Sequence, residues 1–393
     1  MWCGYAANHM FAFVSQPEAP PDTVGARFSI VRLVKSCTWR GCRWPIGLTF
    51  AGLVWMAAIS SGQGQTVYQP GQSYFGRSNY IEYIAGDMPV IFSVPHGGSL
   101  TPSEIPNRNC AGNSADCATI SDGETEELAR AIQQAFHSHY GHFPHVIICR
   151  LKRTKIDCNR DIREGSAGSV YAQQAWEEFH RYINIASNAV VVSTGRGLYI
   201  DLHGQSHPVR RVELGYLLTA DQLTNSDATL NQPAFAPLSS FRSLAAQVPI
   251  PFAELLRGSN SFGALLLAQG YPAVPNPVMP NTCIGANSTF NPTDQDLYFG
   301  GGYNTRLCSS VSQGGPIDGL QVEVNYAGVR DTATNRTRFA AAMAQAMEVF
   351  FASHYRIDLR TGAALAGGTA GPARFHSDPG LLPPQRPPAE KSL

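Results

Sequence analysis

The stretch Pro89-Val-Ile-Phe-Ser-Val-Pro-His-Gly-Gly98 decides the fold, because it joins a short apolar run to a glycine turn. The run 89–94 is typical of a buried strand, and the glycines that follow His96 let the backbone approach a ligand closely. In open α/β sheets, ligands bind at the carboxyl ends of the strands. His96 is therefore a candidate site residue at a strand end.

The same pattern of apolar runs and turns recurs along the chain. Further buried strands are expected at 145–149, 197–202 and 320–324, and helices at 122–139, 173–192, 262–270 and 335–354. Strands that alternate with helices predict an α/β fold of three layers, in which helices cover both faces of a mixed, mostly parallel sheet.

The chain divides into three segments by composition. In residues 1–64, cations precede the uncharged run 46–59 and small residues follow it, which is the pattern of a secretory signal. The run is shorter than the roughly 20 residues that a spanning helix needs, although an uncleaved signal anchor is an alternative. Residues 65–360 are expected to form one folded domain, and the Ala/Gly/Pro-rich stretch 361–393 a disordered tail.

The cysteines agree with export to a secreted or extracytoplasmic location. Six of the nine follow the signal-like segment, an even number that suggests disulfides. Cys110–Cys117 and Cys283–Cys308 would each close a Gly/Asn-rich loop, and elimination then pairs Cys149 with Cys158.

Charge and composition restrict the partners. Lys+Arg and Asp+Glu number 29 each, which argues against nucleic acid and against an anionic membrane surface as the main partner. With 44% hydrophobic and only 15% charged residues, the chain can bury a sizeable core. A small molecule is the expected partner, with no stable membrane contact once the signal is removed.

Two histidines and a carboxylate are candidate metal ligands. His203 ends the expected strand 197–202, as His96 ends its own, so the two can converge on one ion. Each alone could instead be a loop histidine bonded to a carbonyl. The carboxylate is Asp122 or Glu124; Ser121 and Glu124 form a capping-box pattern that would account for Glu124, which favours Asp122. Such a set leaves the fourth position of a zinc ion to water.

Two further clusters carry charge. Five cations lie between 150 and 160, either as a solvated face or as a site for a carboxylate, which arginine holds through paired hydrogen bonds. Glu323 interrupts an apolar strand, where a charge is costly unless it is paired or functional. Strand alternation places Gln321, Glu323 and Asn325 on one face, which could simply be solvated. Otherwise Glu323 would take a proton from the attacking water and pass it to the leaving nitrogen.

In this order the motifs resemble those of the N-formylglutamate amidohydrolase family. They are Pro95-His96-Gly97-Gly98 with Pro102, Asp122 with Leu128, Arg150-x-x-Arg153-x-x-x-Asp157-x-Asn159-Arg160, Asp201-Leu-His203 and Gln321-Val-Glu323, together spanning about residues 88 to 350. More widely, they are similar to zinc carboxypeptidases and aspartoacylases.

The resemblance implies a zinc-dependent amidohydrolase with one zinc ion per chain. The residues that it implies are the zinc ligands His96, Asp122 and His203, the substrate-carboxylate contacts Arg153, Asn159 and Arg160, and the base Glu323. The substrate would be N-formylglutamate or another N-acyl amino acid.

Two departures from the family widen the range of substrates. Members that degrade histidine are usually cytoplasmic, whereas this chain carries a signal-like segment. The insertion 219–251 and the loop 276–315 would reshape the mouth of the pocket. A secreted zinc carboxypeptidase or cell-wall peptide hydrolase is therefore an alternative, and a carboxylate-binding protein without turnover is another.

Overall fold

The computed structural model describes residues 66–110, 117–280 and 298–365. The signal-like segment, Cys283 and the tail beyond residue 365 lie outside the described residues. Within the described part of the chain, none of the helices has the length and apolar character needed to cross a membrane.

An eight-stranded mixed sheet forms the middle of the described structure, in the order β1-β2-β4-β3-β5-β8-β6-β7. The strands are β1 (Ser73–Phe75), β2 (Ile81–Ile84), β3 (Val90–Val94), β4 (His145–Cys149), β5 (Gly197–Gln205), β6 (Val212–Gly215), β7 (Ala273–Val274) and β8 (Ile317–Asn325). The four central strands β4, β3, β5 and β8 run parallel, whereas β2 and β6 pair antiparallel with their outer members.

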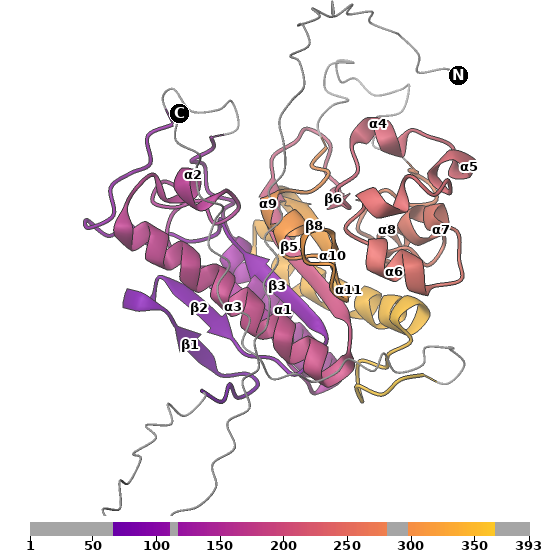
Figure 1. Ribbon diagram of the computed structural model, residues 1–393, viewed down its shortest axis with the longest axis horizontal. Coiled ribbons are helices and arrows are strands. Elements are labelled where there is room, and N and C mark those ends of the chain that lie inside the picture. The colour runs from indigo at the N-terminus through magenta and orange to yellow at the C-terminus, as the bar shows by residue number, and fades with distance from the viewer. Residues whose placement is uncertain (1–65, 111–116, 281–297, 366–393) are drawn as a thin grey trace, which may run out of the picture. The chain divides into compact units, whose positions relative to one another are not determined.

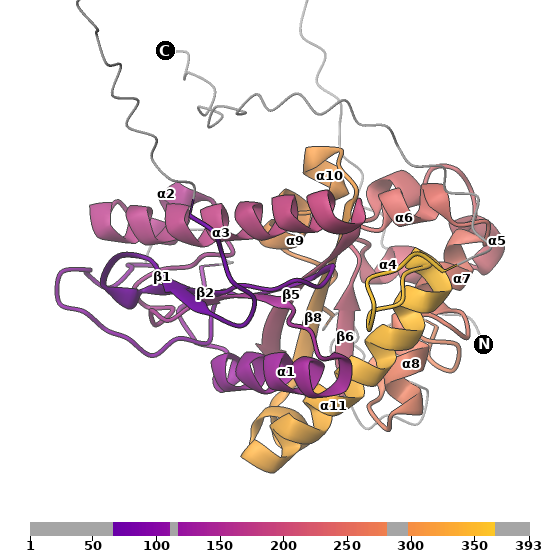
Figure 2. The same ribbon diagram turned by 90° about the horizontal axis from the view of Figure 1, so that it is seen from below.

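Helices cover both faces of this sheet (Figures 1 and 2). On one face lie α3 (Val170–Thr194) and α9 (Tyr303–Leu307), and on the other α1 (Thr125–Tyr140) and α11 (Ala333–Phe350). The remaining helices are α2 (Ile162–Ser166), α4 (Ala220–Leu223), α5 (Asp227–Leu230), α6 (Arg242–Gln247), α7 (Phe252–Arg257), α8 (Phe262–Ala268) and α10 (Ser310–Gln313). The expected three-layer α/β fold with a mixed sheet is confirmed.

Strand alternation divides the core in two. From β3, Phe92 and Val94 pack with α1 and α11, while Ile91 packs on the α3 side. On β5, Leu198, Ile200 and Leu202 all belong to the α1/α11 core. Because successive side chains of a strand point to opposite faces, Asp201 and His203 lie on the α3/α9 face of the sheet.

The strand that carries His203 is longer than expected. The apolar run ends at Leu202, but β5 continues to Gln205, paired in register with β8. His203 therefore lies inside a central strand rather than in the turn after it, and its backbone is held on the β8 side by sheet hydrogen bonds.

Of the two expected disulfides whose cysteines are both described, one is present. Cys110 and Cys117 are bonded, with Cα atoms 5.6 Å apart, as predicted. The Cys149–Cys158 pairing is wrong, because both are buried free thiols in the core under α3. Cys308 is also a buried free thiol, and Cys283, its predicted partner, lies outside the described residues. In such surroundings a thiol packs as a small hydrophobic group.

The insertion 219–251 folds into short helices that pack beside the sheet and against α11. Near the last described residues, Ile357 forms an isolated β-bridge with Ala364.

Candidate metal centre and active site

The first histidine is held where β3 meets the start of α1. His96 follows Val94 by two residues and is 1% exposed. Its carbonyl accepts a hydrogen bond from the backbone N–H of Asp122 at 3.1 Å, which ties the two candidate ligands together. Gly97 permits this approach, because a Cβ there would overlap Thr125 and the backbone of Glu126.

The Asp122 carboxylate is held by a backbone N–H of β5 rather than by a helix cap. The N–H of Gly204, next to His203 on β5, donates to Asp122 Oδ2 at 3.2 Å. The capping box expected from Ser121 and Glu124 is wrong: α1 begins at Thr125, and Glu124 precedes it with a left-handed φ of 66°. The Glu124 carboxylate pairs with Arg336 at 2.8 Å instead. Of the two candidate carboxylates, Asp122 is the one beside the histidines.

Three ligand atoms form a nearly equilateral triangle. His96 Nδ1 lies 3.2 Å from His203 Nδ1, His203 Nδ1 lies 3.1 Å from Asp122 Oδ2, and His96 Nδ1 lies 3.4 Å from the same oxygen. Residues 96, 122 and 203 can therefore hold a metal ion together.

Each histidine is oriented by a second carboxylate. His96 Nε2 donates to Asp157 Oδ1 at 2.7 Å, and His203 Nε2 to Asp201 Oδ2 at 2.8 Å. Because an ionised carboxylate only accepts, these bonds place a proton on Nε2 and leave the Nδ1 lone pairs free to bind a cation. Metal-ligating histidines usually show this arrangement.

The roles of Asp157 and Asp201 were not predicted, although both belong to the quoted motifs. Asp201 carried a usable signal, since residues i and i+2 of a strand share a face and Asp201 precedes His203 by two. Asp157 did not, because its bond to His96 joins residues that lie 61 positions apart.

Glu323 stands beside the metal candidates. It is in register with His203 on the neighbouring strand, and Gln321 donates to its Oε1 at 2.9 Å. The alternative of a solvated face does not hold, since Glu323 is only 5% exposed and Gln321 only 4%.

The predicted substrate contacts are in the same region but differ in their surroundings. Arg153 is occupied with the metal cluster: its Nε donates to Asp157 Oδ2 at 3.0 Å, and its Nη1 lies 3.5 Å from Asp122 Oδ1. The side-chain nitrogen Nδ2 of Asn159 is 3.3 Å from His203 Nε2. Arg160 Nε lies 3.5 Å from Glu164. A substrate role for the three stays a prediction.

A buried arginine that sequence reasoning missed connects the strand ends. The guanidinium of Arg330 donates to the carbonyl oxygens of Gly123, Gln205 and Val324. It thereby links the Asp122 loop to β5 and β8. No local pattern marks this residue, because its partners come from three separate segments.

Burial and neighbouring charges shift the pKa values of the polar groups in this cluster. Burial raises the pKa of Glu323 to about 8. Burial alone would raise the pKa of Asp122, but His96 and His203 outweigh it and hold that pKa well below the usual range. For His203, burial opposes the charge, yet Asp201 and Glu323 raise its pKa well above the usual value. The cluster thus favours a positive charge between its carboxylates, carried by a proton or a metal ion.

A cavity of about 610 Å³ opens over this cluster. Its wall includes the candidate ligands, the three predicted substrate contacts, Glu323, His207 and the segment 298–302. The volume suits a small ligand. Of the two regions expected to reshape the mouth, the loop 276–315 contributes to the wall through its described part, and the insertion does not.

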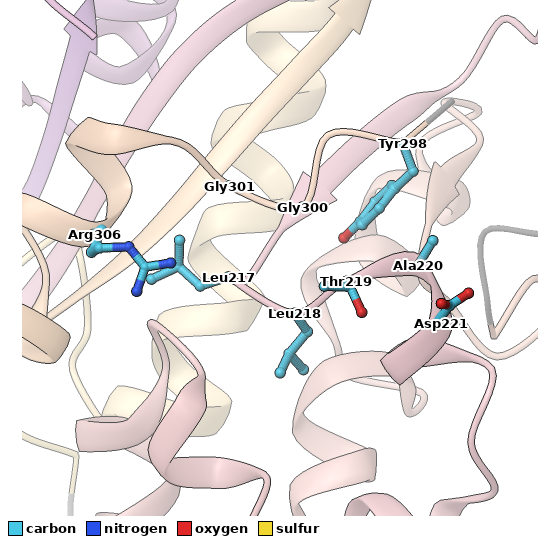
Figure 3. Close-up of a pocket in the computed structure, with 9 residues that line it drawn as sticks. All are labelled: Leu217, Leu218, Thr219, Ala220, Asp221, Tyr298, Gly300, Gly301 and Arg306. Atoms are coloured by element: carbon cyan, nitrogen blue, oxygen red, sulfur yellow. The ribbon is translucent and has the colours of Figure 1, made fainter. Parts of the chain in front are cut away.

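A second cavity of about 380 Å³ shares Tyr298, Gly300 and Gly301 with the first. In Figure 3 these residues run along the segment 217–221, with Arg306 beside Leu217 at one end and Tyr298 above Ala220 at the other. The insertion contributes Thr219, Ala220 and Asp221 to this second wall. The segment 298–302 therefore borders both cavities.

Comparison with known proteins gives only weak likenesses. No family model matches the chain. No curated protein matches it either. Among solved structures, N-formylglutamate amidohydrolase from Ralstonia eutropha is 10% identical, with a TM-score of 0.39, over 71% of this chain and 96% of the other. N-acetylmuramyl-L-alanine amidase from Mycobacterium smegmatis is 12% identical, with a TM-score of 0.30, over 67% and 97%.

A gene product from Agrobacterium tumefaciens is 15% identical, with a TM-score of 0.38, over 70% of this chain and 95% of the other. At such identities and TM-scores, these likenesses carry no argument about function. The chain is an α/β protein with a His-Asp-His cluster that could bind a metal ion.

Proposed function

We propose that this protein is a zinc-dependent amidohydrolase that cleaves the amide bond of a small carboxylate-bearing substrate, such as an N-acyl amino acid. The observation that carries the proposal is the triangle of ligand atoms from His96, Asp122 and His203, with edges of 3.1 to 3.4 Å. The five motifs that resemble N-formylglutamate amidohydrolases support the same activity.

The donor set fits zinc. Tetrahedral zinc binds imidazole nitrogen and carboxylate oxygen at roughly 2.0–2.2 Å, which places neighbouring ligand atoms roughly 3.3–3.6 Å apart. The observed edges are within a few tenths of an ångström of this range. Two histidines and one carboxylate are also the protein ligands of known catalytic zinc sites, which keep one position for water or substrate.

A zinc ion in this site would acidify a water molecule and polarise the scissile carbonyl. The chain itself supplies a base, Glu323, one strand away from His203. Burial raises the pKa of this carboxylate, so it accepts a proton more readily than an exposed glutamate does. Asp157 and Asp201 keep the two imidazoles in place through their Nε2 atoms.

The substrate carboxylate would meet the cavity wall at Arg160 and Asn159. Arg160 contributes charge and is partly exposed, whereas Asn159 is almost buried beside His203. Arg153 is engaged by two aspartates, so its main effect would be to orient them. We also propose that the protein is exported from the cell. Two features support this, the signal-like run 46–59 and the Cys110–Cys117 disulfide.

The alternatives differ in substrate and in turnover. A zinc carboxypeptidase or cell-wall peptide hydrolase would use the same cluster on a longer substrate, and the second cavity beyond segment 298–302 gives that alternative some support. A carboxylate-binding protein without turnover would not need a buried base such as Glu323 beside the ligands.

The test combines metal analysis with a substrate panel. The purified protein should contain one zinc ion per chain, lose it to a chelator, and hydrolyse N-acylglutamates only in the zinc form. Cleavage of peptides but not of N-acyl amino acids would favour the peptidase alternative. A zinc-loaded protein that binds carboxylates but hydrolyses neither class would contradict the proposed function.

A further inference from the structure

A second histidine–carboxylate pair lines the same cavity, outside the metal cluster. His207 Nδ1 donates to Glu213 Oε1 at 2.9 Å. Glu213 is fully buried, and its other oxygen accepts the backbone N–H of Phe299 at 3.0 Å. The imidazole also stacks on the Phe299 ring, with centroids 4.7 Å apart. The ring of His207 is therefore fixed in both position and tautomer.

The sheet places this pair next to the proposed base. Residues 203, 323 and 213 occupy one row across β5, β8 and β6, since His203 is in register with Glu323 and Glu323 with Glu213. Neighbouring strands lie about 4.8 Å apart, so the Cα of Glu213 is about 10 Å from that of His203. His207, which is bound to Glu213, lines the same cavity as Glu323 and the metal cluster.

The second nitrogen of His207 is available to a ligand. Within the described residues, Nε2 makes no hydrogen bond, and the side chain is 13% exposed at the cavity wall. A histidine whose Nδ1–H is held by a carboxylate presents Nε2 in a fixed direction and can carry a proton there, because the carboxylate stabilises the imidazolium. A buried carboxylate is costly, and here three groups offset the cost: the Phe299 N–H, Arg211, whose Nε lies 3.6 Å from Glu213 Oε1, and His207, which faces the cavity.

On the basis of the amidohydrolase function above, we propose that His207 is the general acid that protonates the leaving nitrogen. The oxygen of the water molecule bonds to the carbonyl carbon, and Glu323 takes a proton from that water. When the C–N bond breaks, its electron pair stays on nitrogen, which receives the Nε2 proton of His207. The products are a carboxylic acid and an amine, and solvent returns the proton from Glu323 to His207.

Because Glu323 is the base and His207 the acid in this proposal, it predicts which substrates need His207. The nitrogen of an aliphatic amine, such as glutamate, cannot leave without a proton, whereas a nitro-substituted aniline leaves far more readily. The proposed substrate class is therefore amides of basic amines, and the acid should be dispensable when the leaving amine is weakly basic.

The experiment compares two substrates that share an acyl group and a carboxylate. One is an N-acylglutamate and the other an N-acylated amino-nitrobenzoate. His207→Gln should lower kcat about 10²- to 10⁴-fold on the first and much less on the second, with KM similar. Equal losses on both substrates would show a structural role and overturn the proposal, as would full activity.

His142→Gln is the matched control. His142 also bonds a carboxylate through Nδ1, to Asp87 at 2.7 Å, but it is 41% exposed and does not line the cavity. It should leave kcat on both substrates unchanged. Zinc content should equal that of the wild type in both variants, because neither histidine belongs to the cluster.

A second readout does not depend on turnover. In nitrogen-15 NMR spectra of the zinc-loaded protein, His207 should carry its proton on Nδ1 when neutral, and Glu213→Gln should abolish that preference. A neutral His207 protonated on Nε2 would overturn the proposal. If the wild type binds zinc and hydrolyses neither substrate, the amidohydrolase function fails and the acid role with it; an active wild type with an equally active His207→Gln variant rejects the acid role alone.

Discussion

His203 of β5 and Glu323 of β8 stand opposite each other in register on neighbouring parallel strands. Because both point to the same face, the pairing of two strands sets the separation between a proposed metal ligand and the proposed base. Sheet hydrogen bonds hold both backbones, so this geometry does not depend on a mobile loop. A site built this way is rigid before any substrate arrives.

Replacing the base should separate metal binding from turnover. Glu323→Gln keeps the size of the side chain and its contact with Gln321 but cannot accept a proton. We expect normal zinc content and a fall in kcat of about 10²- to 10⁴-fold. Metal analysis and initial rates on an N-acylglutamate check this. Turnover at the wild-type rate would mean that another group is the base.

Removal of one ligand should abolish metal binding and activity together. His203→Ala leaves His96 and Asp122, which are too few for a catalytic zinc site. The wild type should gain thermal stability when zinc is added, since a ligand that binds only the folded state stabilises it. The variant should gain none. If it retains full zinc occupancy, His203 is not a ligand.

The carboxylate behind His203 should tune metal affinity. Asp201→Asn keeps the shape of the side chain but weakens the bond to His203 Nε2, which is 2.8 Å long in the wild type. Such partners typically contribute 10- to 100-fold to metal affinity, and we expect a loss of about that size. Competition with a coloured chelator measures it. An unchanged affinity would show that His203 is oriented by other contacts.

The position of the buried Arg330 should depend on glycine at position 204. A Cβ on Gly204 would overlap the guanidinium of Arg330, which links the Asp122 loop to β5 and β8. Gly204→Ala should therefore lower both zinc affinity and kcat. Gly123→Ala is the matched control, because a Cβ there meets nothing within 4 Å. Equal effects of the two changes would argue against the role of Arg330.

A buried acid away from the site should make stability depend on pH. Burial raises the pKa of Asp318 to about 7, although Leu244 N–H and Tyr355 donate to it. In the unfolded chain the pKa is about 4, so between these values the folded state binds a proton that the unfolded state lacks. Its stabilising effect is complete below about pH 4 and is lost as the pH rises through 7.

Asp318→Asn removes this titration. Relative to the variant, the wild type should lose roughly a few kcal/mol of unfolding free energy between pH 4 and 8. Urea unfolding at several pH values measures the difference. The exposed Asp221→Asn serves as control and should follow the wild type. A parallel pH profile for Asp318→Asn and the wild type would contradict the expected effect.

Local patterns in the sequence determined the main elements. The apolar run before His96 became β3, and the run 145–149 became β4 with the same bounds. Such runs are read from neighbouring residues alone, so no tertiary information is needed. Motif order also singled out residues 96, 122 and 203, whose ligand atoms the fold brings to 3.1–3.4 Å from one another.

Tertiary structure decided what depends on residues far apart in the chain. The extension of β5 through His203 follows from its pairing with β8, and the bond between His96 and Asp157 from the packing of loops 61 residues apart. Cys149 and Cys158 are free thiols that contact each other in the core, a contact between two segments that only the tertiary structure shows. Local composition predicts secondary structure, whereas partner choice depends on which segments the sheet brings together, and that is a property of the whole fold.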